Sequence, residues 1–106
     1  MGWEIEYTYE AKDDLVSLDN SQRIQVLKSI NKVSENPLPA SEGGYGKPLG
    51  NKMSSRLAGY FKIKLKKLGI RVVYGLVRED KIMRVIVISI RSDDTVYKIA
   101  QKRAQK

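Results

Sequence analysis

Lysines alternate with apolar residues in the segment FKIKLKK, which begins at Phe61. Successive side chains of a β-strand point to opposite faces, so Lys62, Lys64 and Lys66 would share one face. The apolar residues between them would pack on the other face. Because like charges this close repel one another, the pattern indicates either a solvated strand or a binding surface for a polyanion.

Such side chains could cleave RNA through its own 2′-hydroxyl group. The reaction needs a base for the hydroxyl proton, positive charge over the phosphorane and an acid for the 5′-oxygen. The sequence has no histidine and no cysteine, so lysine, arginine, tyrosine or carboxylates would have to supply these groups. Neighbouring cations make the proton of a lysine or a tyrosine easier to remove. The candidates are Lys62, Lys64 and Arg71 for the phosphate, Lys62 or Tyr97 for the base, and Arg91 for the departing oxygen.

Each of these residues also has an ordinary structural explanation. Alternating lysines more often solvate or protect an edge strand than catalyse a reaction. Tyr97 could be a packing residue of a helix, or it could stack on an RNA base. A basic segment such as 98–106 is more often a solvated surface than a binding surface for ribosomal RNA. The catalytic interpretation therefore depends on the joint occurrence of these residues.

The first half of the chain predicts one strand and a pair of helices. Apolar residues alternate over 3–9, which is typical of a half-buried strand that includes Tyr9. Helical spacing follows at 11–18 and 21–34, and Asn20 or Ser21 could cap the second helix. The apolar positions of these helices are Leu15, Leu18, Ile24, Leu27, Ile30 and Val33.

The second half predicts a loop, three strands and a last helix. Residues 37–58 hold all three prolines and many glycines, so we expect a long surface loop. Strand-like segments follow at 59–67, 70–77 and 83–90, joined as hairpins. A two-residue turn at 68–69 would place Lys66 opposite Arg71.

The apolar run 85–88 suits a central strand that helices cover on one side. A helix from about 94 to 102 would carry Val96, Ile99 and Ala100 inward, and Lys98, Lys102 and Arg103 outward. Together these elements predict an α+β fold: a small antiparallel sheet of about four strands, packed with an N-terminal helical hairpin and a C-terminal helix.

Positive charge is concentrated in the second half. Residues 1–55 carry six Lys/Arg against eight Asp/Glu, whereas residues 56–106 carry fourteen against four. This imbalance indicates a nucleic-acid partner, or an acidic protein that neutralises the basic half. At 106 residues the chain is expected to form one small domain, residues 1–106.

Metal ions, other cofactors and membranes are not expected to take part. The acidic pairs at 13–14, 79–80 and 93–94 lie at predicted turns and helix ends without a converging set. Asp93 and Asp94 would cap the last helix. The N-terminal segment lacks the features of a signal peptide, and no apolar run approaches the roughly 20 residues that cross a bilayer. A cytoplasmic protein is therefore expected.

Several segments together resemble the RelE/ParE superfamily of type II toxins, and its RelE branch most. They are KPLGN, LAGYFKIKL, GIRVVY and SIRSDDTVYKIAQKR. The resemblance implies a RelE-like fold and cleavage of messenger RNA in the ribosomal decoding site, the A site. Compared residue by residue, the resemblance implies that the functional positions of the family correspond to Lys62, Lys64, Arg71, Arg91 and Tyr97. Phe61 departs from a common tyrosine, and the loop at 38–55 is longer than in compact members.

Three functional classes remain open at this point. The first is a metal-independent, ribosome-dependent endoribonuclease, and the second is a ParE-like DNA gyrase inhibitor without catalysis. The third is an RNA-binding module without activity. The five marked residues favour the nuclease, because a binding toxin has no need to assemble them.

The resemblance also implies partners. They are a small, acidic, partly disordered antitoxin and the ribosome, with the 16S rRNA around the A site and the message. The residues expected to contact RNA are Lys47, Lys52, Lys66, Lys98, Lys102 and Arg103.

Overall fold

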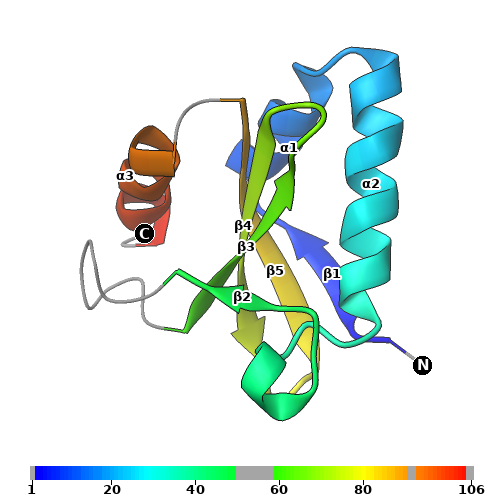
Figure 1. The fold of residues 1–106 in the computed structure, drawn as a ribbon. Coiled ribbons are helices and arrows are strands. Elements are labelled where there is room, and N and C mark those ends of the chain that lie inside the picture. Colours follow the sequence, from blue (N-terminus) through cyan, green and yellow to red (C-terminus); the bar gives the residue numbers. More distant parts are fainter. Residues whose placement is uncertain (1, 50–58, 91–92, 105–106) are drawn as a thin grey trace.

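The protein is an α+β fold with a mixed sheet of five strands (Figure 1). The computed structural model describes residues 2–49, 59–90 and 93–104. The elements are β1 (Glu4–Tyr7), α1 (Tyr9–Val16), α2 (Asn20–Ser34), a 3-10 turn (Ala40–Glu42), β2 (Lys47–Pro48), β3 (Tyr60–Leu65), β4 (Ile70–Val77), β5 (Ile82–Ser89) and α3 (Asp93–Ala104).

The strand order is β1-β5-β4-β3-β2, and β1 runs parallel to β5 while the other neighbours are antiparallel. The predicted fold class is confirmed, with one more strand than expected and one parallel pair.

Helices cover both faces of the sheet, not one as the sequence suggested (Figure 1). Helices α1 and α2 pack on one face, where Val26 and Ile30 contact a cluster that includes Tyr74. Helix α3 packs on the other face through Val96 and Ala100. The sheet therefore lies between two apolar layers, and its α3 side carries the candidate site.

A bulge in β5 explains why its sequence is apolar without alternation. Val73 pairs with Val87 and Tyr74 pairs with Val85, so Ile86 is an extra residue on β5. Val85 and Ile88 join the cluster under α1 and α2, whereas Ile86 and Val87 join the cluster under α3. The extra residue shifts the side-chain alternation in the middle of the strand.

The predicted helical hairpin is present, but three of its details are wrong. Tyr9 begins α1 instead of continuing β1, and it is 85% exposed. Asp19 caps α2 through the Gln22 amide at 2.8 Å in a capping box, so neither Asn20 nor Ser21 is the cap. Ile24 is 48% exposed, and Val26 instead occupies the buried stripe.

The hairpin between β3 and β4 turns through four residues, 66–69, instead of two. Leu65 pairs with Ile70 and Lys64 pairs with Arg71, so the predicted Lys66 partner is wrong. Gly69 closes the turn at φ 67°, a conformation that favours glycine.

Residues 37–49 of the predicted surface loop are attached to the sheet. The buried Tyr74 hydroxyl donates to the Pro37 carbonyl oxygen at 2.9 Å, and burial raises the pKa of this hydroxyl. Arg78 donates to both carboxylate oxygens of Glu42 at 3.0 Å each. Strand β2 then pairs with β3. The loop thus brings Lys47 to the sheet edge.

Tyr74→Phe should lower the free energy of unfolding by about 1–3 kcal/mol, because it leaves the buried Pro37 carbonyl without its donor. Urea denaturation measures this change. Tyr9→Phe is the matched control, since the Tyr9 side chain is exposed and its loss of a hydroxyl should cost under about 0.5 kcal/mol. Equal stability of the two variants would contradict the anchoring role of Tyr74.

Candidate nucleic-acid cleavage site

Four cations lie on the α3 face of the sheet, at β2, β3 and β4. Lys47 pairs with Lys62, and Lys64 pairs with Arg71. Residues directly opposite each other in a ladder share a face. Lys62 and Lys64 alternate with the buried Ile63, which packs on the other side. We call Lys47, Lys62, Lys64 and Arg71 the cationic face.

Helix α3 brings Tyr97 to the cationic face. The Lys62 ammonium nitrogen, Nζ, donates to the Tyr97 hydroxyl at 3.0 Å, and it lies 5.8 Å from the centre of the Tyr97 ring. The Tyr97 side chain is buried among the apolar residues that hold α3. Its ring thus fixes the hydroxyl beside an amine at a separation that permits direct proton transfer.

The turn end of the β3–β4 hairpin forms a small open hollow beside the cationic face. Its volume is about 160 Å³, and it is lined by Lys64, Leu65, Lys66, Gly69, Ile70 and Arg71. Although Lys66 does not pair with Arg71, it lines the same hollow. An anion in this space would meet ammonium and guanidinium groups from both sides of the turn.

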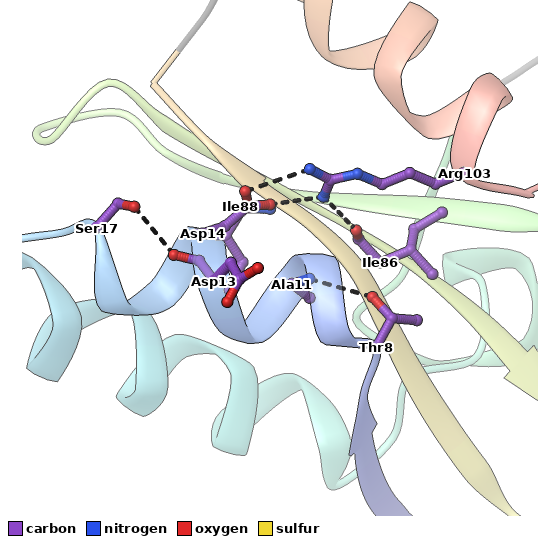
Figure 2. Close-up of polar contacts among 8 residues, drawn as sticks. All are labelled: Thr8, Ala11, Asp13, Asp14, Ser17, Ile86, Ile88 and Arg103. Atoms are coloured by element: carbon purple, nitrogen blue, oxygen red, sulfur yellow. Dashed lines mark hydrogen bonds and ion pairs between the residues drawn. The ribbon is translucent and has the colours of Figure 1, made fainter.

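The predicted RNA-contacting residues have different positions in the structure. Lys98 and Lys102 are exposed on α3, as predicted. Arg103 is not: its guanidinium faces Asp14 and the Ile86 carbonyl oxygen, so the prediction of an outward Arg103 is wrong (Figure 2). Arg91 and Lys52 fall outside the described residues, as do the side chains of the predicted cap residues Asp93 and Asp94.

Asp14 is the structural residue that the sequence analysis missed. It was grouped with Asp13 as one of several acidic pairs at turns and helix ends. In the structure it accepts from both Arg103 and the Ile88 backbone amide (Figure 2). The available signal was its spacing: Asp14 follows the apolar Ala11 by three residues and precedes Leu18 by four, which places it on their side of a helix.

Acidic clusters of the kind that binds metal ions are not found in the described ranges. Within residues 2–49, 59–90 and 93–104, no group of three or more His, Cys, Asp or Glu side chains could hold a metal ion. Within the same ranges, none of the helices has the length and apolar character needed to cross a membrane.

Comparison with known proteins gives matches over nearly the whole chain. No protein-family model matches it. An Escherichia coli protein described as a RelE-like toxin is 27% identical over an alignment of 107 positions, which covers 97% of this chain and 98% of that protein.

Solved structures give matches of similar extent. The free E. coli toxin RelE, in a variant with two arginines replaced by alanine, is 26% identical with a TM-score of 0.75, covering 97% of this chain and 98% of RelE. A crystal structure of isolated E. coli RelE is 26% identical with a TM-score of 0.68, covering 95% of this chain and 97% of RelE. A chain of a RelBE toxin–antitoxin complex from Mycobacterium tuberculosis is 23% identical with a TM-score of 0.67, covering 88% and 95%, which indicates a shared fold.

Proposed function

Because the chain is a RelE-type toxin, we propose that it cleaves messenger RNA in the A site of the ribosome and thereby inhibits translation in the cytoplasm. The observation that carries the proposal is the Lys62–Tyr97 hydrogen bond of 3.0 Å on a sheet face with three further cations. Such a site offers proton transfer and phosphate binding together. A surface that only binds a partner has no need to combine them.

The proposed reaction is attack of the RNA 2′-hydroxyl on the neighbouring phosphate. Lys64 and Arg71 stabilise the negative charge of the phosphorane. Lys62 or Tyr97, in its deprotonated form, takes the proton of the 2′-hydroxyl. The 2′-oxygen then bonds to phosphorus, the bond from phosphorus to the 5′-oxygen breaks, and the 5′-oxygen takes up a proton from water, which leaves a 2′,3′-cyclic phosphate and a 5′-hydroxyl end. Arg91 is proposed to stabilise the departing 5′-oxygen. The reaction uses these side chains and no metal ion.

The ribosome supplies the geometry of the substrate in this proposal. Attack requires the 2′-hydroxyl and the phosphate of the message to be held in line, which costs conformational entropy. The small cationic face is not expected to impose this geometry on a free strand, whereas the ribosome is. Lys47, Lys66, Lys98 and Lys102 are proposed to contact RNA phosphates, because they are cationic and exposed. Cleavage should therefore weaken as salt concentration rises.

An antitoxin is proposed as the partner that neutralises the toxin. The formal net charge is +8, and the cationic face would attract an acidic segment. RelE structures with bound RelB antitoxin are among those that the chain resembles. We propose a small, acidic and partly disordered antitoxin that covers or distorts the cationic face.

The test adds the purified protein to ribosomes programmed with a defined message and maps new 5′ ends by primer extension. The same message is incubated without ribosomes. We expect cuts in the A-site codon that depend on ribosomes. No cleavage by a folded protein would contradict the proposal, and a gyrase supercoiling assay would then test the ParE-like alternative.

Tyr97→Phe should lower the cleavage rate roughly 100-fold, because it removes the hydroxyl bonded to Lys62 and keeps the buried ring. Single-turnover primer extension measures the rate, and circular dichroism checks the fold. Tyr7→Phe is the control, since Tyr7 lies on β1 and packs against the cluster under α1 and α2. An unchanged rate in Tyr97→Phe would remove Tyr97 from the proton transfer.

A further inference from the structure

The outer edge of β5 loses its strand partner halfway along. Strand β1 pairs with β5 up to Tyr7 and Val85, the Thr8 amide donates to the Val85 carbonyl at 3.1 Å, and the chain then enters α1. Two β5 backbone groups beyond this point are bound by side chains. The Ile88 amide donates to Asp14 Oδ2 at 3.0 Å, and Arg103 Nη1 donates to the Ile86 carbonyl oxygen at 2.7 Å. Asp14 and Arg103 thus provide hydrogen-bond partners for backbone groups of β5 that a neighbouring strand would otherwise bind.

Asp14 and Arg103 also bind each other (Figure 2). Arg103 Nη1 donates to Asp14 Oδ2 at 2.7 Å, and Nη2 donates to Oδ1 at 3.3 Å. Both side chains are only 20% exposed. A forked, partly buried pair of this kind is directional, because the guanidinium and carboxylate planes must match. It joins α1, β5 and the last turn of α3 at one point.

The side chains of Tyr97 and Arg103 hold helix α3 at separate positions. Tyr97 is bonded to Lys62, and Arg103 is bonded to Asp14 and Ile86. Tyr97 and Arg103 are six positions apart, which corresponds to about 9 Å along the helix axis. Between these points Ala100 packs against the sheet with a small side chain. Both positions belong to one helix, so a shift of the end that carries Arg103 would also move the Tyr97 hydroxyl.

We propose that the Asp14–Arg103 pair is a clamp that positions α3, and through it the Tyr97 hydroxyl at Lys62. The inference rests on the proposed cleavage reaction. Both are positioning residues, because their charges are turned toward each other and toward β5. The clamp would account for an arginine facing inward on a helix whose neighbouring Lys102 is exposed.

The first test compares Arg103→Gln with Tyr97→Phe and with the variant that carries both changes. Arg103→Gln should lower the single-turnover rate at saturating protein by roughly 10-fold or more, since small misplacements of a reacting group are costly. The protein concentration giving half the maximal rate should stay within about twofold, because no RNA contact is lost. In the Tyr97→Phe background the same change should cost less than about twofold. Losses that multiply would overturn the clamp.

Arg84→Gln is the matched control for the loss of an arginine–carboxylate pair. Arg84 Nε binds Glu6 at 2.5 Å and joins β5 to β1, with both side chains 46% exposed. This pair does not include a residue of α3, so its loss should change the rate by less than about twofold. An equal loss in Arg84→Gln and Arg103→Gln would mean that general loosening of the sheet edge, and not the clamp, sets the rate.

A covalent cross-link distinguishes two possible roles of Arg103: holding α3 in position, and contacting RNA with its charge. The chain has no cysteine, so Asp14→Cys with Arg103→Cys introduces one reactive pair. Joining the two thiols with a short bis-maleimide should restore most of the rate lost in the unlinked variant. A linked protein that stays as slow as the unlinked one would overturn the clamp, because position would then not be what Arg103 supplies.

Hydrogen exchange tests the clamp independently of cleavage. In Arg103→Gln the amides of residues 97–101 should exchange faster, while those of β4 stay unchanged. If the unmodified protein proves inactive on ribosomes, the proposed function fails, yet exchange still decides whether the pair holds α3. Unchanged exchange in α3 would overturn the clamp even if the cleavage rate fell. Arg103→Lys, which keeps the charge but not the fork, should give an intermediate exchange rate.

Discussion

Lys62→Met should lower the single-turnover rate of cleavage on programmed ribosomes by roughly 100- to 10,000-fold. Methionine keeps most of the length and apolar volume of the half-buried lysine stem, so β3 should keep its packing. The ammonium that donates to Tyr97 at 3.0 Å is lost, together with one charge of the cationic face. In cells the same variant should no longer arrest growth at equal expression.

Lys28→Met is the matched control for this prediction. Lys28 is exposed on α2, which covers the opposite face of the sheet. It should cleave at the normal rate, and thermal unfolding should show that both variants are folded. Full activity of Lys62→Met would remove the centre of the proposed site, because Tyr97 would then have no essential partner there.

Lys62→Arg distinguishes charge from proton transfer at the same position. A guanidinium stays protonated in proteins, so it can stabilise the phosphorane but cannot act as the base. If Lys62 is the base, we expect Lys62→Arg to be as slow as Lys62→Met. If Tyr97 is the base, part of the lost rate should return. The two assignments that the sequence left open thus predict different rates for one variant.

Local patterns were enough to predict most of the fold. Alternation along 60–65 identified β3 and placed Lys62 and Lys64 on one face, because side-chain alternation is a property of the strand itself. Helical spacing identified α2, since a single buried stripe sets its period. The approach of Tyr97 to Lys62 was not visible in any local pattern. It was expected only from the RelE resemblance.

The bulge at Ile86 and the inward Arg103 were missed because contacts between distant segments override a local pattern, whereas the turn at 66–69 was a local error of turn length. The bulge at Ile86 depends on how β5 pairs with β4, and it turns an apolar run into two buried faces. The four-residue turn at 66–69 gives Arg71 a different partner from the one that a shorter turn would give. Arg103 looked like one more surface cation, because its partner lies 89 residues away on α1.

A single 2′-deoxynucleotide at the scissile position of the message should stop cleavage there. In the proposed reaction the nucleophile belongs to the RNA, and the side chains of the cationic face supply only charge and proton transfer. Removing that hydroxyl therefore removes the reacting group, whereas phosphate contacts remain. Primer extension across a chimeric message measures the loss at this position.

A deoxynucleotide placed one residue downstream is the control, and it should leave cleavage nearly unchanged. The products give a second reading of the same step. Attack by the 2′-hydroxyl releases a 5′-hydroxyl end, so the downstream fragment should need a kinase before it can be ligated through a 5′-phosphate. Continued cutting at the deoxy position, or a 5′-phosphate end, would mean that water attacks the phosphate. Lys64 and Arg71 would then keep their role in stabilising charge, but Lys62 or Tyr97 would have to deprotonate water instead of the RNA.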